Sequence, residues 1–214
     1  DALPRPWMAS PRLRLDEFSP MHADDIVKLH ADPRMRSQLI DDYPIYTQGA
    51  AAEFLGKLKL VYRRYEGLGI WRAERLLPTD PEVLAEAQAA VDAGEIGPQV
   101  LDLLRQPSWE YCGWFNLMPV TGRPDEVEIG ARLMPDAWGG QLVMDGGEWL
   151  LLHAFTQLAH ERVLGICNPA NRSAIHTLRA LGFGEPQRIH YDGQDALEFV
   201  ITADEWQAVS AKPR

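Results

Sequence analysis

The sequence predicts a mixed α/β domain in which antiparallel hairpins are combined with strands that alternate with helices. Two patterns support this prediction. Apolar and polar residues alternate in short runs such as 12–15 and 127–133, as they do in half-buried strands. Between residues 51 and 65, apolar residues recur at helical spacing. With 214 residues, 46% of them apolar, the chain is long enough for one domain with a sizeable core.

The first third of the chain is expected to supply a tail, two strands and two helices. Pro33 is expected to end the first helix, because proline lacks the amide that continues a helix. Thr47 is placed to cap the second helix, and Gly67 is placed to end it. The expected elements are a tail over 1–11, a strand over 12–15, helices over 19–33 and 47–66, and a strand over 69–76.

Residues 78–108 differ from their surroundings, and we interpret them as an acidic helical insertion between two strands. Asp and Glu outnumber the single basic residue, Arg105, by six to one in this segment. Pro81 suits the first turn of one helix, which Gly94 ends, and a second short helix follows Pro98. Three roles stay open for the insertion: covering an acceptor cleft, forming the surface of a homodimer, or standing in solvent as an appendage.

The rest of the chain is expected to form a hairpin, followed by strands that alternate with helices. Turn-forming residues at 121–125 separate the two strands of the hairpin. Asn171 begins the last expected helix, and Gly182 ends it. The expected strands are 111–118, 127–133, 162–167, 187–191 and 196–202, the expected helices are 143–160 and 171–182, and the domain as a whole spans 12–206 with a tail over 207–214.

Charge and composition exclude several classes of function. The formal charge of −10 opposes binding of DNA or RNA through the overall field and suits a cationic substrate such as an amine. No apolar run approaches the roughly 20 residues of a membrane helix, and the start of the chain lacks the apolar stretch of a signal peptide. We therefore expect a cytoplasmic protein without a membrane partner.

Cys112 and Cys167 are expected to be buried thiols. His153 and His160 have no third ligand nearby in sequence, so no metal is expected.

Four motifs give the chain a resemblance to a known family. They are Glu128–Pro135, Trp138-Gly139, Asn168–Asn171 and Leu178–Phe183. In this order and spacing they resemble the GNAT acyltransferases, and among these the branch that acetylates the N-termini of ribosomal proteins. The resemblance implies a six- or seven-stranded, mostly antiparallel mixed sheet that is splayed at its centre and has helices on both faces. It also implies direct transfer of an acetyl group from acetyl-CoA to a primary amine.

The resemblance places acetyl-CoA in the gap between the strands that end near Leu133 and Cys167. Backbone amides at a helix N-terminus suit a pyrophosphate, and the peptide-like pantetheine arm can pair with a strand edge. Side-chain amides stand near the opposite edge. The expected cofactor contacts are Arg132, Leu133, Met134, Gly139, Gly140, Gln141, Leu142, Val143, Met144, Asn168 and Asn171.

Catalysis on an amine requires a base, because an α-amine has a pKa of about 7.7–8.0 and attacks only when neutral. Glu128 is our first choice, since it lies one strand-length before the thioester position, and Glu110 is the second. Ser173 is the candidate acid for the leaving thiolate. The alternatives are an ion pair of Glu128 with Arg132 and a helix-start hydroxyl for Ser173.

The acceptor amine is expected to belong to a small molecule or a peptide, such as a peptide N-terminus, an amino acid or a polyamine. Aromatic rings can line a pocket for it, and carboxylates can attract its charge. For the tryptophans, packing in the core is the alternative, and for the acidic loop a solvated turn is the alternative. The candidate acceptor contacts are Asp41, Tyr43, Trp71 and Trp114.

Two departures from the family's pattern bear on function. Gln141 and Val143 stand where the phosphate loop has small residues, and a non-glycine residue in a left-handed conformation costs about 1–2 kcal/mol. The usual acids are also missing, because the hydroxyl of Ser173 comes one residue early and Leu178 replaces a tyrosine. The alternative function is therefore a catalytically silent or non-CoA GNAT-fold protein that binds a small molecule or a partner because Gln141 and Val143 block the loop.

Overall fold

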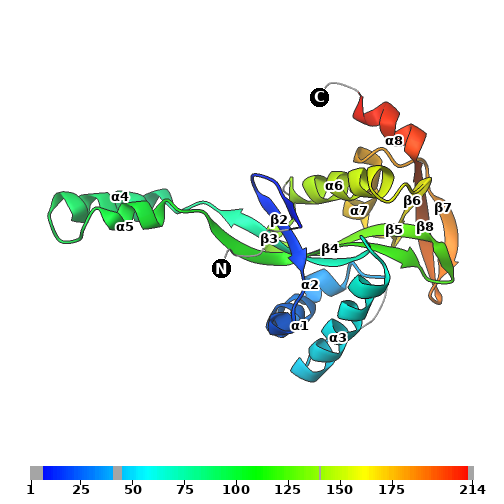
Figure 1. Ribbon diagram of the computed structural model, residues 1–214, viewed down its shortest axis with the longest axis horizontal. Helices are drawn as coiled ribbons and strands as arrows, with labels where there is room; N and C mark the ends of the chain where they lie inside the picture. Colours follow the sequence, from blue (N-terminus) through cyan, green and yellow to red (C-terminus); the bar gives the residue numbers. More distant parts are fainter. Residues whose placement is uncertain (1–6, 41–44, 140, 212–214) are drawn as a thin grey trace.

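A single open sheet forms the middle of the molecule. The computed structural model describes residues 7–40, 45–139 and 141–211, and within them eight strands follow the order β1-β2-β3-β4-β5-β6-β8-β7 (Figure 1). Neighbouring strands are antiparallel except β5 and β6, which are parallel. The strands are β1 (Met8–Ala9), β2 (Leu13–Glu17), β3 (Gly69–Leu77), β4 (Ser108–Val120), β5 (Arg123–Leu133), β6 (Arg162–Cys167), β7 (Gln187–Tyr191) and β8 (Gln194–Thr202).

Helices cover both faces of this sheet, which confirms the predicted fold class. Figure 1 shows α1, α2 and α3 on one face and α6 and α7 on the other, while α4 and α5 stand away from the sheet. The helices are α1 (Ala23–Ala31), α2 (Pro33–Arg36), α3 (Gln48–Arg64), α4 (Pro81–Asp92), α5 (Gln99–Leu104), α6 (Leu142–Thr156), α7 (Arg172–Ala180) and α8 (Ala203–Ser210), with short 3-10 turns η1 (Pro20–His22) and η2 (Pro135–Ala137).

Helix starts follow the capping residues in the sequence. The Thr47 side chain accepts a hydrogen bond from the Ala50 amide at the start of α3, as predicted. Pro33 ends α1 but also begins the unpredicted helix α2, because proline is tolerated in a first turn, and Asp32 caps this helix. Helix α6 ends at Thr156 rather than near 160, and Ala159 there has a φ of 54°, which a right-handed helix cannot continue.

Both ends of the chain hold more structure than the expected tails. The eighth strand, β1, lies within residues 1–11 and pairs with β2 through Met8 and Leu15. Helix α8 extends to Ser210, into the segment that was expected to be a tail. Its start is a capping box, in which Thr202 accepts from the Glu205 amide while the Glu205 carboxylate accepts from the Thr202 amide.

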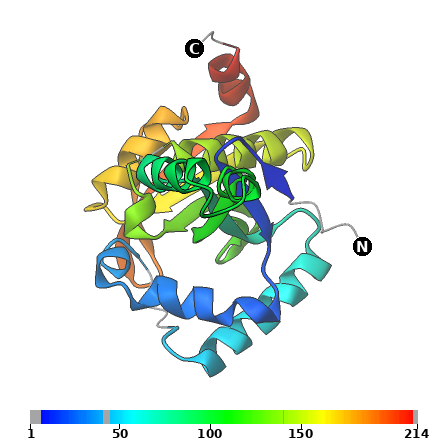
Figure 2. The same cartoon turned by 90° about the vertical axis from the view of Figure 1, so that its left-hand side faces the viewer.

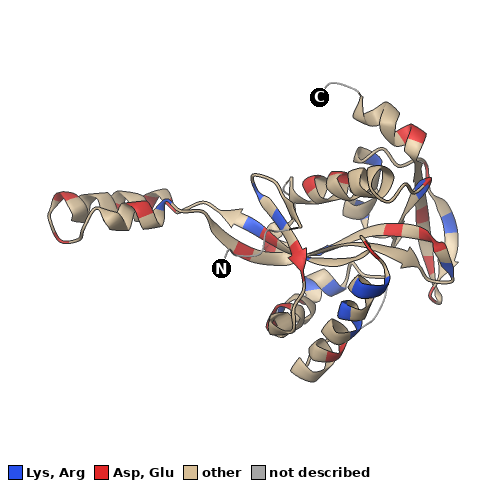
Figure 3. Ribbon diagram, viewed as in Figure 1, with Lys and Arg blue, Asp and Glu red and all other residues tan. Residues whose placement is uncertain are grey.

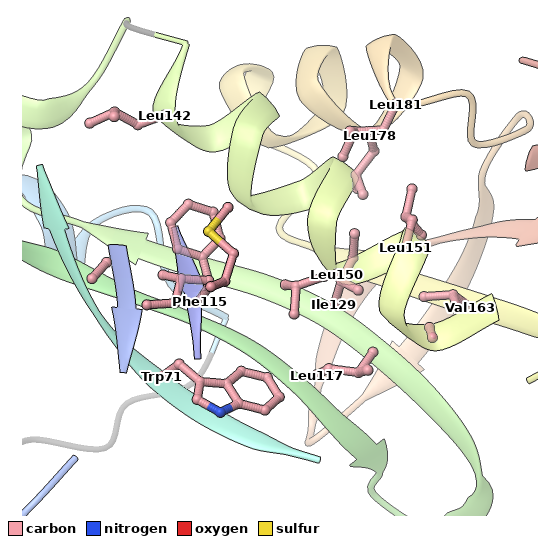
Figure 4. Packing of buried hydrophobic residues seen from close by; sticks show 14 of the residues in the cluster. Trp71, Phe115, Leu117, Ile129, Leu142, Leu150, Leu151, Val163, Leu178 and Leu181 are labelled. Carbon is pink, nitrogen blue, oxygen red and sulfur yellow. The ribbon is translucent and has the colours of Figure 1, made fainter. Parts of the chain in front are cut away.

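Two apolar clusters lie on opposite faces of the sheet. The larger one packs α6 and α7 against the strands, as Figure 4 shows. The smaller one packs α1, α2 and α3 against the other face. The larger cluster includes Trp71, Phe115, Leu117, Leu150, Leu151, Leu178 and Leu181, and the smaller includes Phe18, Ile26, Leu29, Leu55, Leu58 and Trp114.

The sheet opens between β5 and β6. Their parallel pairing covers only residues 127–129 of β5 and 163–165 of β6, although β5 continues to Leu133 beside β4. Opposite this region β4 carries a bulge, because its register with β3 shifts between Ala73 and Glu74. Gly113 at the bulge has a φ of 131°, and a Cβ there would lie 2.0 Å from the Arg132 carbonyl oxygen. The predicted splay at the centre of the sheet is thereby confirmed.

Candidate active site

The open edge of β5 presents backbone groups at alternate residues. The Met134 amide donates to the Cys112 carbonyl of β4 at 2.8 Å, so even-numbered residues at this end of β5 direct their backbone groups toward β4. The backbone groups of Ala131 and Leu133 therefore face the side from which β6 has diverged. Of the three backbone contacts predicted for the cofactor, Leu133 faces the opening, whereas Arg132 and Met134 face β4.

Side-chain exposure marks the same opening on the α6 face. Ala131 is exposed although it lies on a central strand, whereas Ile129 and Leu133, on the same face, are each only 8% exposed. The indole Nε1 of Trp138 donates to the Leu133 carbonyl at 2.8 Å, which ties the loop before α6 to this edge. Ala131 was missed as a site residue, although the period of two along a strand would have selected it with Leu133.

The N-terminus of α6 lies beyond this loop and carries amides that have no partner within the helix. The first amide to donate within the helix is that of Asp145, to the Gln141 carbonyl at 2.9 Å. The amides of Leu142, Val143 and Met144 precede it, and the Gln141 side chain makes no capping hydrogen bond. Such a helix end attracts anions.

The two unusual loop residues adopt ordinary conformations. Gln141 has φ −77° and ψ −5°, in the right-handed region, so the strain expected of a left-handed non-glycine residue does not arise. Val143 is partly buried and packs against the larger apolar cluster. Gly139 has a φ of 74°, and no atom lies within 4 Å of a Cβ built there. Gly140 lies outside the described residues.

An ion pair that sequence reasoning missed joins the turn between β1 and β2 to the first turn of α6. The Arg12 guanidinium binds both oxygens of the Asp145 carboxylate, at 2.7 and 3.0 Å, and the Ser10 hydroxyl donates to the same carboxylate at 3.2 Å. The contact spans more than half of the chain, and no sequence pattern signals it. It ties the start of α6 to the turn between β1 and β2.

The two asparagines at the opposite edge stabilise the turn from β6 into α7. The Asn168 side chain accepts from the Ala170 amide at 2.8 Å. The Asn171 side chain accepts from the Ala174 amide at 3.0 Å, as the cap of α7, and donates to the Gln38 carbonyl at 3.3 Å. These side-chain amides therefore bind backbone groups of the chain itself, and their role as cofactor contacts stays a prediction.

The candidate acid positions differ sharply in burial. Ser173 lies exposed in the first turn of α7, where its hydroxyl can reach solvent. Leu178 is 7% exposed and packs over β6, so that a Cβ on Gly165 would lie 2.4 Å from its Cδ2 atom. Leu178 is therefore a core residue, and of the two positions only that of Ser173 offers a hydroxyl.

The two candidate bases lie at different places on the sheet. Glu128 is partly buried on β5, opposite Met118 of β4 and beside Leu164 of β6, at the point where β5 and β6 begin to separate. Glu110 lies toward the start of β4, where its carboxylate binds the Arg75 guanidinium at 2.8 Å. Glu128 therefore lies at the opening between β5 and β6, whereas Glu110 lies in an ion pair elsewhere on the sheet, and which of them acts as the base stays a prediction.

On the face that carries α1 and α3, Arg132 is held by aromatic neighbours. Its guanidinium lies 5.0 Å from the centroid of the Trp114 ring and 3.2 Å from Nε2 of His30. His30 is 1% exposed, and its Nδ1 lies 2.8 Å from the Ile26 carbonyl. Because Nδ1 must donate to that carbonyl, Nε2 is left to accept from Arg132. Sequence reasoning missed His30, since no local pattern indicates that it supports this site.

The two candidate acceptor tryptophans do not share a pocket. Trp71 is 2% exposed, belongs to the cluster under α6 and stacks on Trp7 with 4.0 Å between ring centroids. Trp114 is 3% exposed, belongs to the opposite cluster and stacks on Phe54 at 5.7 Å. Both rings pack in the core, which was the alternative for them. Asp41 and Tyr43 lie outside the described residues.

The two cysteines of the chain lie in the larger apolar cluster. Cys112 and Cys167 are buried and free, as predicted, and burial raises the pKa of their thiols to about 12 and about 11. Among the described residues, no cluster of three or more His, Cys, Asp or Glu side chains could hold a metal ion. No described helix is long and apolar enough to cross a membrane.

A hollow of about 1000 Å³ lies on the α6 side, away from the splay. It is lined by Trp7, Gly67, Trp149 and His153, among others, and so lies beside the C-terminal half of α6. The chemistry described above lies instead at the N-terminal end of this helix and at the open edge of β5. We therefore take the splay, rather than this hollow, as the candidate active site.

Comparisons with known proteins identify the family and the fold. The acetyltransferase (GNAT) domain family matches residues 12–184. No curated protein sequence matches the chain. Among solved structures, one described as an acetyltransferase from T. thermophilus has 19% identity and a TM-score of 0.65, over 98% of this chain and 95% of that chain.

Two further structures of similar fold were solved with ligands. The RimL ribosomal-protein alpha-N-acetyltransferase, in complex with coenzyme A, has 14% identity and a TM-score of 0.64, over 92% of this chain and 98% of its own. The microcin self-immunity acetyltransferase MccE, in complex with acetyl-CoA and AMP, has 11% identity and a TM-score of 0.62, over 90% of this chain and 93% of its own. At such identities the likeness is one of fold.

Proposed function

Because the chain belongs to the GNAT acetyltransferase family, we propose that it transfers an acetyl group from acetyl-CoA directly to a primary amine. The observation that carries this proposal is the end of β5–β6 pairing at Ile129 and Gly165, which leaves the Leu133 edge of β5 open near the N-terminus of α6. This arrangement offers a strand edge to a peptide-like arm and helix amides to a pyrophosphate.

The residues present fit acetyl-CoA on several counts. The α6 amides of Leu142, Val143 and Met144 would hold the pyrophosphate, since Gln141 needs no strained backbone and Val143 packs inward. The backbone of Ala131 and Leu133 would pair with the pantetheine arm. The Leu133 carbonyl already accepts from Trp138, so this indole would give way or share the oxygen.

Glu128 would act as the base. As the amine nitrogen forms its bond to the thioester carbon and the carbon–sulfur bond breaks, the amine loses a proton, which the Glu128 carboxylate accepts directly or through a water molecule. The departing thiolate takes a proton from solvent or from the exposed hydroxyl of Ser173. A thiol has a pKa of about 8.5, so a strong acid is not essential for this step.

The acceptor in this proposal is a primary amine, and the charge of −10 favours a cationic one. RimL, by its description, acetylates the α-amine of a ribosomal protein, and peptide N-termini are one of the classes that we propose for this chain. Free amino acids and polyamine-like molecules are the others. We propose that the reaction takes place in the cytoplasm.

Calorimetric titration with acetyl-CoA tests the cofactor site. We expect micromolar binding by the native protein, and equal or tighter binding by a Gln141→Gly/Val143→Ala variant. If only the double variant binds, Gln141 and Val143 block the loop, and the chain is a GNAT-fold protein that binds a different small molecule or a partner. Dephospho-CoA serves as the matched ligand that separates pyrophosphate contacts from those of the 3′-phosphate.

A further inference from the structure

The acidic insertion forms an arm that projects from the sheet. We define the arm as residues 78–107, which carry α4 and α5 beyond the last β3–β4 pair, Leu77 with Ser108. Figure 1 shows both helices well outside the body, and Figure 2 looks along them from the end. Within the described residues, the extensive packing of α4 is against α5, around the buried side chains of Ala87 and Leu101.

The arm presents apolar side chains among acidic ones. Val83 on α4 is 44% exposed, and Leu103 on α5 is 64% exposed. Acidic residues adjoin both, with Glu82 and Glu86 beside Val83 and Asp102 beside Leu103, and all three are exposed. A two-helix hairpin of this size buries little apolar surface of its own, so a partner that covers these residues would stabilise it.

The outward face of α3 carries the complementary pattern. Leu60 is 63% exposed at its centre. Exposed basic residues lie around it on α3, which has Glu53 as its single acidic residue. Figure 3 colours the basic residues of α3 blue and the acidic residues of the arm red. The basic residues are Lys57, which also pairs with Glu53 at 2.6 Å, and Lys59, Arg63 and Arg64.

We propose that the arm docks on the outward face of α3 in a second copy of this chain. Acidic residues would then meet basic ones while Val83 and Leu103 cover Leu60, and charge complementarity of this kind fixes partner and register. The arm points away from its own body in Figure 1, so an intermolecular contact is the one that its direction favours. A two-fold pair would form the contact twice, because each copy has both surfaces.

Charge reversal tests this proposal without touching the core. The arm variant is Glu82→Lys/Glu86→Lys/Asp102→Lys, and the α3 variant is Lys59→Glu/Arg63→Glu/Arg64→Glu. Light scattering should give the native protein a molar mass of twice 24.1 kDa. In each variant alone the dissociation constant of the dimer should rise at least about 100-fold, because like charges then face each other. The matched control, Arg188→Glu on exposed β7, should remain a dimer.

Mixing the two variants gives the sharper result. In the mixed pair, a basic arm meets an acidic α3 and an acidic arm meets a basic α3, so the heterodimer should form although neither variant pairs with itself. Circular dichroism of each variant checks that it is folded. A monomeric native protein at 100 µM, or a dimer that survives both reversals, would overturn the proposal, and a native monomer that binds a basic protein would assign the arm to a different partner.

Discussion

At the scale of single residues, the proposed chemistry depends on Glu128, which lies where β5 and β6 separate. If its carboxylate accepts the amine proton, Glu128→Gln should lower kcat/KM by about 10²–10⁴-fold, because general-base catalysis contributes that much. Acetyl-CoA affinity should change little, since the side chain is not among the phosphate contacts. Steady-state kinetics together with calorimetry measure both quantities.

Glu110→Gln provides the matched control for this variant. Its carboxylate binds Arg75 on another part of the sheet, so we expect near-native kcat/KM and only a small loss of stability. A large loss of activity in Glu110→Gln, with native activity in Glu128→Gln, would exchange the two roles. Equal and modest losses in both would indicate that solvent takes the proton.

His153 is expected to make stability depend on pH. Burial lowers the pKa of its imidazole below 6.5, while its Nε2 donates to the Gly67 carbonyl at 2.9 Å. The folded state then binds fewer protons than the unfolded state, so stability is complete above pH 6.5 and declines as pH falls below it. Urea denaturation between pH 7.5 and 5 should show this decline, with a shallower one in His153→Gln.

Residue roles were predictable where they depend on local sequence. Thr47 caps α3 as expected, and Asn171 stands at the start of α7 as expected, because capping needs only a side-chain oxygen beside the first amides of a helix. Roles that depend on sheet face were not predictable. Trp71 pairs with Phe115, so Trp114, the next residue of β4, points to the opposite face, and the two rings lie in different clusters because of a cross-strand register that neither segment reveals alone.

At the scale of elements, helix α6 lies close to its neighbours because it carries two buried glycines. A Cβ on Gly146 would lie 2.2 Å from the Phe115 ring, and one on Gly147 would lie 2.7 Å from a Leu181 methyl group. We therefore expect Gly146→Ala to destabilise the protein by about 1–2 kcal/mol, since overpacking exceeds the gain of about 1 kcal/mol in helix propensity. Chemical denaturation measures the difference.

Gly56→Ala is the matched control on another helix. No atom lies within 4 Å of a Cβ built at Gly56, in the middle of α3, so the propensity gain stands alone. This variant should be more stable than the native protein by about 0.5–1 kcal/mol. Stabilisation by Gly146→Ala would show instead that Phe115 can move aside, and that the glycines are not needed for close packing.

The bounds of an element were predictable where the periodicity of its apolar residues and the turn residues that flank it agree. The strands β6 and β7 have the predicted bounds, because apolar alternation ends at clear turn residues. The two-residue strand β1 is too short to show a period, and it forms only because β2 offers a free edge. Helix α8 was not predicted, because its amphipathic pattern is weak. Thr202 and Glu205 do match the capping-box pattern at its start.

At the scale of the whole molecule, the mixed α/β class was predictable from the order of the elements and the central splay from a family resemblance, and the arm was predictable in its acidic composition and its two helices but not in its direction. Its direction depends on how β3 and β4 leave the sheet, which no local pattern encodes. The sheet and its two apolar clusters hold the candidate site, whereas the arm contributes no residue to either cluster.

Removing the arm should therefore leave the folded body intact. Replacing residues 78–107 by Asn-Gly would close β3 and β4 as a tight hairpin, and the free energy of unfolding should stay within about 1 kcal/mol of the native value, as for other changes outside the core. Acetyl-CoA affinity should also persist, because the α6 N-terminus and the β5 edge lie in the body. Thermal and calorimetric measurements on dilute protein test both expectations.

The same deletion distinguishes the three roles that the sequence left open for the arm. If the arm covers the acceptor cleft, its removal should raise the KM for the amine and leave the oligomeric state unchanged. An arm that forms the dimer surface would leave the chain monomeric with its KM for the amine unchanged, which is the result we expect from the complementary charges of the arm and α3. A solvated appendage would change neither quantity, because nothing would then depend on Val83 and Leu103 being covered.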